Sequence, residues 1–293
     1  MYRVGFRAMG SSCEIVIASI GKKEAKAIAA LGIKEVERIE RKYSRYLAGS
    51  VVSEINGSAA KDWVECDEET CALLDYADLL YRSSGGLFDI TSGVLRKVWD
   101  FDREDVPHPE TLFPILKLID WQQVERKGSA VRLTVAGMQL DFGGIGKEYA
   151  ADSAAAILHE KGIMHGYVNL AGDIRVIGPK PDGTPWIIGI RDPRNGERMI
   201  ASIPVISGAL ATSGDYERYF EADGRRYCHI LNPVTGYPVT FWRSVTVLAP
   251  LATTAGSCTT ITMLKESEGL NYLKKSGMRF LAVDQSGKIY HND

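Results

Sequence analysis

Short alternating segments joined by tight turns dominate the sequence, and they constrain the fold more than any other feature. Residues 2–9 and 12–18 alternate in polarity on either side of Gly10, which predicts a β-hairpin. Further strands of this kind are expected at residues 121–126, 130–135, 138–142, 166–170, 173–177, 186–191, 198–203, 206–212, 216–222, 226–231 and 244–249. Strands connected by tight turns favour antiparallel sheets over alternating βαβ units.

Helical segments are expected between the groups of strands. Apolar residues recur with helical spacing through residues 22–43, and Asp67 is placed to cap a helix over residues 68–82 that Gly85 would end. Further helices are expected at residues 148–161, 254–264 and 267–276. Because no repeat or linker divides the chain, the sequence predicts a single domain over residues 1–293. Its expected fold is α+β, with mostly antiparallel sheets and flanking helices.

Charge and motif content exclude several classes of protein. The 35 Lys and Arg residues nearly balance the 37 Asp and Glu residues, which argues against nucleic-acid binding driven by charge. Neither the Gly-x-Gly-x-x-Gly nor the Gly-x-x-x-x-Gly-Lys-Ser/Thr fingerprint is present, and no His-Glu-x-x-His or Cys-x-x-Cys pair indicates zinc. The chain has no apolar run long enough to cross a membrane and no signal peptide. We therefore expect no nucleic-acid partner, no membrane span, a cytoplasmic location and reduced cysteines.

The segment from Leu140 to Asp152 is the most informative about chemistry. It runs from a strand end through Gly143-Gly144 to a helix start that carries Lys147. Glycines let backbone amides approach an anion closely, the start of a helix favours negative charge, and the lysine adds a positive charge. The segment therefore predicts an anion site, and a plain strand-to-helix turn is the alternative interpretation.

His229 is the second candidate for chemistry. It stands at the end of a predicted strand, just before an Asn-Pro turn that begins at Asn232. With an ordinary pKa near 6.5, an imidazole there could take a proton from a hydroxyl. A hydrogen-bonded structural histidine is the alternative interpretation.

Seven segments, in order along nearly the whole chain, resemble the FAD:protein FMN transferase (ApbE) family. They are Met9 to Ser11, Tyr43 to Tyr46 with Ser50 to Asn56, Gly86 to Ile90, Leu140 to Asp152, Asn169 to Ile174, Ala211 to Tyr219, and His229 to Gly236. The resemblance implies two intertwined halves that enclose a flavin cleft. It also implies that FAD binds with Mg²⁺, and that FMN is transferred from FAD to a Ser or Thr hydroxyl of a target flavoprotein with release of AMP.

The same resemblance implies roles for individual residues. His229 would be the base that deprotonates the acceptor hydroxyl. The metal would be held by the carbonyl of Gly144 and the hydroxyls of Thr259 and Thr260. The FAD site would be lined by Met9, Tyr46, Leu87, Phe88, Asp89, Asp141 and Lys147.

The chain departs from the family pattern at two positions. Gly256 stands where the family usually has a metal-binding Asp, so the charged ligand is missing, and Asp173 and Asp215 are the candidates to replace it. Asn232 stands where the family usually has Asp, although an amide can still hold a turn. Two alternative functions therefore stay open: a FAD-binding protein with little or no transferase activity, and a FAD pyrophosphatase. Because the family often carries an export signal and a lipid-anchor cysteine, a trimmed exported precursor is the alternative to a cytoplasmic protein.

Overall fold

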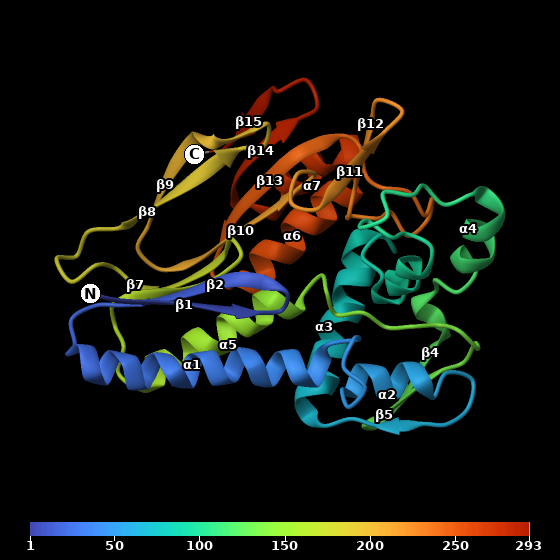
Figure 1. The fold of residues 1–293 in the computed structure, drawn as a ribbon, viewed down its shortest axis with the longest axis horizontal. Helices are drawn as coiled ribbons and strands as arrows, with labels where there is room; N and C mark the ends of the chain where they lie inside the picture. Colours follow the sequence, from blue (N-terminus) through green and yellow to red (C-terminus); the bar gives the residue numbers. More distant parts are fainter. Residues whose placement is uncertain (293) are drawn as a thin grey trace.

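The structure, a computed structural model that describes residues 1–292, is built on an eight-stranded antiparallel sheet (Figure 1). The strands lie in the order β1-β2-β6-β7-β10-β13-β14-β15, and each neighbouring pair is antiparallel. Their bounds are β1 Tyr2–Ala8, β2 Ser11–Ile17, β6 Gly166–Leu170, β7 Asp173–Gly178, β10 Gly208–Gly214, β13 Trp242–Ala249, β14 Arg279–Asp284 and β15 Ile289–His291. The expected mixture of antiparallel sheets and flanking helices is confirmed.

The two faces of this sheet are covered differently. Alternation along β2 sends Ile15 and Ile17 into the core beneath the helices, while Val16 points to the opposite face and packs with Trp186. The helices on the first face are α1 Lys22–Tyr43, α5 Gly146–Glu160, α6 Ala252–Leu264 and α7 Gly269–Ser276. A hairpin of β8 Trp186–Asp192 and β9 Asn195–Val205 lies over the other face (Figure 1).

Most of the remaining elements lie beyond the C-terminal end of α1 in Figure 1, and residues of some of them form a separate aromatic cluster. Trp99, Phe101, Phe220 and Tyr227 pack with ring centroids between 5.2 and 6.4 Å apart. The elements are α2 Val51–Gly57, β3 Val64–Glu65, α3 Glu68–Ser84, η1 Ile90–Lys97, α4 Pro109–Leu116, η2 Trp121–Gln123, β4 Val124–Lys127, β5 Ala130–Leu133, β11 Tyr219–Ala222, β12 Arg225–Cys228 and η3 Glu266–Glu268.

The expected bounds of α1 and the expected capping residues of α3 are confirmed. The helix predicted over residues 22–43 is α1, with the same bounds. At the start of α3, the Asp67 carboxylate accepts a hydrogen bond of 3.0 Å from the backbone N–H of Thr70. At its end, Gly85 adopts a left-handed conformation with φ 75°. The capping residues that the sequence predicts for α3 are therefore confirmed.

The strand expected at residues 138–142 is wrong. Both backbone hydrogen-bonding groups of Leu140 bind the side chain of Asn56, at 2.6 and 3.0 Å, so this segment cannot pair with β5. The third strand of the small sheet is β3 instead, and residues 121–123 form the short helix η2. A side chain 84 positions away in the sequence decides the conformation here.

Two further expectations concern the cysteine thiols and helices that could span a membrane. All five cysteines have free thiols, as expected for reduced cysteines. Across residues 1–292, none of the helices combines the length and apolar character needed to span a bilayer.

Candidate functional site

The start of α5 forms the centre of the candidate site. The helix begins at Gly146 after the turn at Gly143 and Gly144, and no side chain caps its first backbone N–H groups. A Cβ on Gly144 would lie only 3.1 Å from the ring of Phe88, so a side chain at this position would crowd the ring. Uncapped N–H groups at the start of a helix favour an anion, as the glycine-rich segment predicts.

Three consecutive side chains of the first turn of α5 point to three different elements. Lys147 pairs with Asp173 on β7, with 2.7 Å between Nζ and Oδ2. The hydroxyl of Tyr149 donates to Glu69 at the start of α3, at 2.8 Å. Glu148 lies against α6, because the position of a Cβ on Gly256 would be 2.5 Å from its Oε1. One helical turn therefore joins the sheet, α3 and α6.

Asp152, one turn further along α5, fixes how α5 and α6 pack. Its carboxylate accepts hydrogen bonds from the backbone N–H of Ala252 at 2.8 Å and of Thr253 at 2.9 Å. These are the first two residues of α6, so Asp152 caps that helix from outside. The cap holds α6 in place relative to the turn that carries Glu148.

Glu148 is buried in an unusual way for a carboxylate. Its relative exposure is 7%, and its Oε2 has no hydrogen-bond partner among the described residues. Burial raises the pKa of Glu148 to about 8, and the negative charge of Asp173 adds to the rise. The sequence does not single out Glu148, because the order of residues in the Leu140–Asp152 segment does not show that this side chain lies against Gly256 on α6.

His229 lies at the end of β12, in an electropositive setting. Its backbone N–H donates to the carbonyl of Arg218 at 2.9 Å, and its carbonyl accepts from Nη2 of Arg96 at 3.2 Å. Burial, together with the positive charges of Arg96 and Lys147, lowers the pKa of His229 to about 4. The imidazole is therefore neutral at pH 7, and its buried Nδ1 has no partner within residues 1–292.

The turn after His229 keeps its shape despite the amide at Asn232. Oδ1 of Asn232 accepts from the backbone N–H of Val234 at 2.9 Å and of Thr235 at 3.2 Å. Its backbone N–H also donates to the carbonyl of Tyr237 at 2.9 Å. The expectation that an amide can hold this turn is confirmed.

Arg96 is a second residue that the sequence did not reveal. It lies in the last turn of η1, and burial lowers its pKa although Asp141 and Tyr46 are close enough to act in the opposite direction. Its Nη2 reaches the carbonyl of His229, while Nη1 has no partner in the described part of the chain. A buried guanidinium with an unused donor is suited to bind an anion.

Asp141 is tied to the backbone around it. It accepts a hydrogen bond of 2.8 Å from the N–H of Gly143, and it lies 3.2 Å from the guanidinium of Arg45. Arg45 also donates to the carbonyl of Gly93 and to Gln139. Asp141 thus fixes the glycine turn in front of α5.

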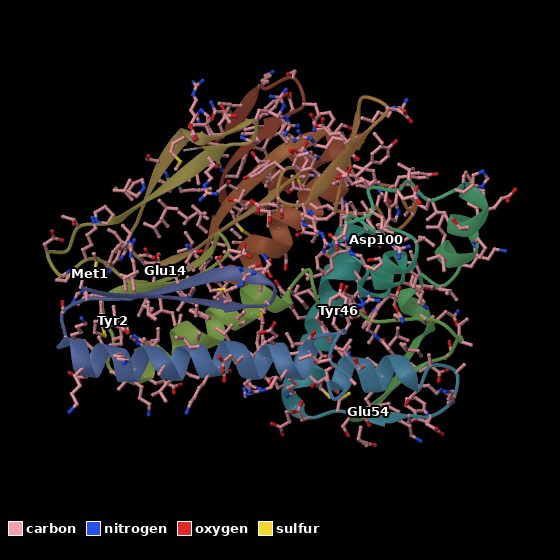
Figure 2. The ribbon with its side chains drawn as sticks, in the orientation of Figure 1. Met1, Tyr2, Glu14, Tyr46, Glu54 and Asp100 are labelled. Atoms are coloured by element: carbon pink, nitrogen blue, oxygen red, sulfur yellow. The ribbon has the colours of Figure 1, made fainter. Side chains whose placement is uncertain are left out.

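The other residues predicted to line FAD lie on several elements around this turn. Met9, at φ 51°, forms the corner of the first hairpin and donates its N–H to Glu40 at 2.7 Å. Tyr46 is 77% exposed. It lies just beyond the end of α1 (Figure 2). Leu87 is half-buried and Phe88 is buried. The carboxylate of Asp89 is fully used by Thr91 and the backbone of Trp121, so it holds η1 in place.

Of the predicted metal donors, Thr259 and Thr260 lie on α6 beside β10, whereas Gly144 lies in the turn before α5. The hydroxyl of Thr259 donates to the carbonyl of Gly256 at 2.8 Å and contacts the hydroxyl of Ser213 at 2.8 Å. The hydroxyl of Thr260 lies 3.4 Å from that of Ser213. Within residues 1–292, no group of three or more His, Cys, Asp or Glu side chains is arranged to hold a metal.

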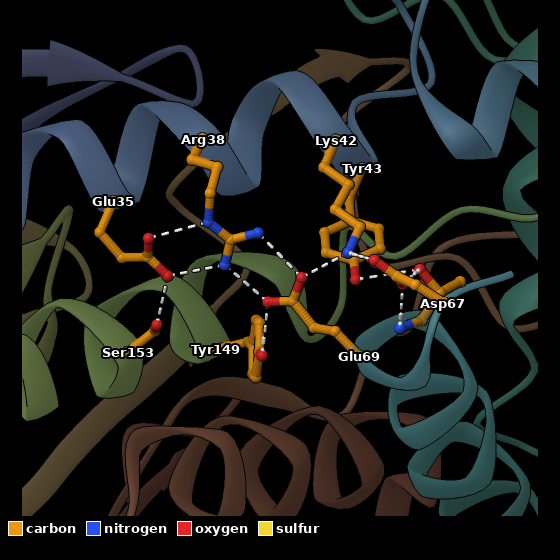
Figure 3. Close-up of polar contacts among 9 residues, drawn as sticks. Glu35, Arg38, Lys42, Tyr43, Asp67, Glu69, Tyr149 and Ser153 are labelled. Atoms are coloured by element: carbon orange, nitrogen blue, oxygen red, sulfur yellow. Dashed lines mark hydrogen bonds and ion pairs between the residues drawn. The ribbon is translucent and has the colours of Figure 1, made fainter.

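A second polar cluster lies at the junction of α1, α3 and α5 (Figure 3). Arg38 donates to both oxygens of Glu69, at 2.6 and 2.8 Å, and to both oxygens of Glu35, at 2.7 and 2.8 Å. Lys42 pairs with Glu69 and with Asp67. We call this group the helix-junction network. It contains none of the residues predicted to bind FAD or metal.

Known proteins resemble this chain along most of its length. A family model described as the ApbE family matches residues 9–282. The FAD:protein FMN transferase of Treponema pallidum is 33% identical over 86% of this chain and 75% of that protein, and the one of Vibrio cholerae is 31% identical over 80% and 72%.

Solved structures agree with these relatives. The crystal structure of the ApbE protein of Thermotoga maritima matches with a TM-score of 0.92 and 36% identity, covering 100% of this chain and 97% of that one. The apo form of the flavinyl transferase ApbE of Pseudomonas stutzeri matches with a TM-score of 0.87 and 26% identity, covering 100% and 94%. The chain belongs to the ApbE family.

Proposed function

We propose that this protein is a FAD:protein FMN transferase, and that one domain over residues 1–293 carries the whole reaction. The observation that supports this most is the likeness to FAD:protein FMN transferases over most of the chain, with His229 and Lys147 both near the start of α5. The acceptor is a Ser or Thr hydroxyl of a target flavoprotein. Flavin binding alone and FAD hydrolysis are less favoured, because the matched relatives are transferases.

The pyrophosphate of FAD is bound by positive charge and backbone N–H groups. The uncapped start of α5, the ammonium of Lys147 and the unused Nη1 of Arg96 provide these donors. Met9, Tyr46, Leu87 and Phe88 line the remainder of FAD in this proposal. Asp89 and Asp141 act by fixing the loops around it.

The oxygen donors near α6 fit a hard divalent cation such as Mg²⁺. The carbonyl of Gly144 and the hydroxyls of Thr259 and Thr260 are oxygen ligands, and a buried carboxylate oxygen without a protein partner lies against the same helix. Mg²⁺ commonly uses one or two carboxylates together with substrate phosphates, so a site poor in acidic residues is compatible with it. When bound, the cation would supply charge neutralisation on the pyrophosphate.

His229 acts as the general base in this proposal. Its neutral imidazole takes the proton from the acceptor hydroxyl as that oxygen bonds to the phosphorus on the FMN side of FAD. The bond from this phosphorus to the bridging oxygen breaks, and AMP leaves with that oxygen. The lowered pKa keeps His229 in its proton-accepting form at neutral pH.

A mass measurement tests the proposal. The protein is incubated with FAD, Mg²⁺ and a target flavoprotein, and a matched target whose acceptor Ser or Thr is replaced by Ala is the control. We expect the first target alone to gain the mass of FMN less one water, with one AMP per transfer. FMN and AMP released without any target would instead support the pyrophosphatase, and an unchanged target mass would contradict the transferase.

A further inference from the structure

The side chain of Glu148 fills the space that a side chain at position 256 would occupy. A Cβ on Gly256 would lie 2.5 Å from both Cγ and Oε1 of Glu148 and 2.8 Å from its Cδ. Contacts this short do not occur between packed atoms, so both positions cannot carry a side chain without a shift. A carboxylate from α5 thus stands at the place on α6 where the family usually has Asp.

We propose that Glu148 is the charged metal ligand of this protein, delivered from α5 in place of the missing aspartate on α6. This inference rests on the proposed function, because it assigns a ligand to the metal that the transferase would use. It adds one carboxylate to the neutral donors at Gly144, Thr259 and Thr260. It also gives a reason for the glycine at position 256, since only glycine leaves room for Glu148.

The register between α5 and α6 supports this assignment. The two helices run in opposite directions at their contact, because Asp152 caps Ala252 while Glu148, one turn earlier, meets Gly256, one turn later. Residues four apart share one face of a helix. Continued by another turn, the same register directs the start of α5, which follows the glycine turn, toward the turn of α6 that carries Thr260. Glu148 therefore lies on the face of α5 that packs against the Gly256–Thr260 turn of α6.

The burial of the Glu148 carboxylate also favours a cation ligand at this position. The side chain is more than nine-tenths buried, and its Oε2 lacks a hydrogen-bond partner in the part of the chain that the structure describes. A buried carboxylate without a partner is costly unless a positive charge or a donor compensates it. The nearby ammonium of Lys147 bonds to Asp173. A cation bound at Oε2 would satisfy this oxygen.

The two candidates named from the sequence to replace the aspartate, Asp173 and Asp215, bind other side chains. Asp215 binds the guanidinium of Arg194 through both oxygens, at 2.6 and 2.7 Å. Asp173 holds Lys147. The three atoms nearest to the position of a Gly256 Cβ all belong to Glu148. Glu148 is thus the carboxylate that takes over this place.

Direct metal titration tests the inference. Mn²⁺ is titrated into the full protein with FAD present, unbound Mn²⁺ is measured by electron paramagnetic resonance, and Mg²⁺ is added as competitor. Glu148→Gln keeps the shape of the side chain and removes its charge. Glu217→Gln is the matched control, because it removes another negative charge that acts on Lys147. The double variant E148A/G256D returns the carboxylate to α6.

We expect Glu148→Gln to weaken Mn²⁺ binding by about tenfold or more, because the site loses its charged ligand. Glu217→Gln should stay within about twofold of the wild type, and E148A/G256D should recover most of the affinity. Gly256→Asp alone should lower the melting temperature, because its Cβ would collide with Glu148.

The outcomes separate this inference from the proposed function. Unchanged Mn²⁺ affinity in Glu148→Gln, or no Mn²⁺ binding by the wild type with FAD, overturns the inference whether or not FMN is transferred. A wild type that binds Mn²⁺ through Glu148 but transfers no FMN overturns the function and leaves the ligand assignment standing. If E148A/G256D has a normal melting temperature but does not recover Mn²⁺ affinity, this result also contradicts the inference that Glu148 replaces the aspartate of α6.

Discussion

Two polar clusters contact the first turns of α5, and they differ in how completely their groups are paired. In the helix-junction network, Arg38 and Glu69 satisfy one another through two hydrogen bonds (Figure 3). In the candidate site, Arg96, Glu148 and His229 each have a buried polar atom without a partner among residues 1–292. Only Arg243 and Ser244 show the same feature elsewhere in the described chain.

The paired charges of the helix-junction network stabilise the fold, whereas the unpaired groups of the candidate site are available to bind a ligand. Buried polar groups in proteins are nearly always paired, so three unpaired atoms around one helix start call for an explanation. A guanidinium donor suits an anion, a carboxylate oxygen suits a cation, and a neutral imidazole suits a proton. Together they match the substrate, metal and acceptor hydroxyl of the proposed reaction, whereas none of the buried unpaired atoms of residues 1–292 belongs to the helix-junction network.

Among the changes in the candidate site, replacing His229 should have the largest effect on activity. We expect His229→Ala to lower kcat by about 10²- to 10⁴-fold, because proton transfer by a positioned base contributes about that much. FAD affinity, measured by flavin fluorescence titration, should stay within about twofold. If the variant loses FAD binding together with turnover, then His229 is a structural residue and the base lies elsewhere.

Replacing Arg96 should affect binding more than turnover. We expect Arg96→Gln to weaken FAD binding by about 10- to 100-fold, since a charged hydrogen bond contributes about 1.5–3 kcal/mol. Arg38→Gln removes the same kind of side chain from the helix-junction network and should leave FAD binding unchanged. Equal FAD affinity in the two variants would mean that an unpaired donor does not distinguish the site from the network.

The sequence predicts long elements well and contacts across the chain poorly. The periodicity of residues 22–43 and the capping residue Asp67 are local signals, and α1 and α3 follow them. The strand expected at residues 138–142 fails because Asn56, remote in sequence, takes the hydrogen bonds of Leu140. Short helices such as α2 and α4 were missed since one or two turns leave little periodicity to detect.

The candidate site divides in the same way. The glycine turn, Lys147 and His229 follow from local sequence and from resemblance to the family. Glu148 and Arg96 do not, because their importance depends on what lies opposite them in space. The sequence shows that glycine replaces the usual aspartate at position 256. That Glu148 occupies the space next to Gly256 follows only from the packing of α5 against α6.

The helix-junction network should respond in stability and not in function. We expect Glu69→Gln to lower the free energy of unfolding by about 1–2 kcal/mol, because Arg38, Lys42 and Tyr149 lose a charged acceptor that is partly screened by solvent. The melting temperature, followed by circular dichroism, should fall by about 2–5 °C. FAD binding should not change. Loss of FAD binding at a normal melting temperature would assign the network to the site.

The smallest effect is expected when the pH is lowered, and it tests the electropositive setting of His229. A base with a pKa of about 4 is about 90% neutral at pH 5, whereas one with an ordinary pKa near 6.5 is about 3% neutral. We therefore expect kcat/KM, which reports the free enzyme, to fall by less than about twofold between pH 7 and pH 5. Between pH 6.5 and 4 the unfolded chain binds this proton more readily than the folded one, so the free energy of unfolding falls as the pH falls. Melting curves at each pH must therefore show a folded protein before its rate is used. A fall of tenfold or more in the folded protein would mean that Arg96 and Lys147 do not hold the imidazole neutral.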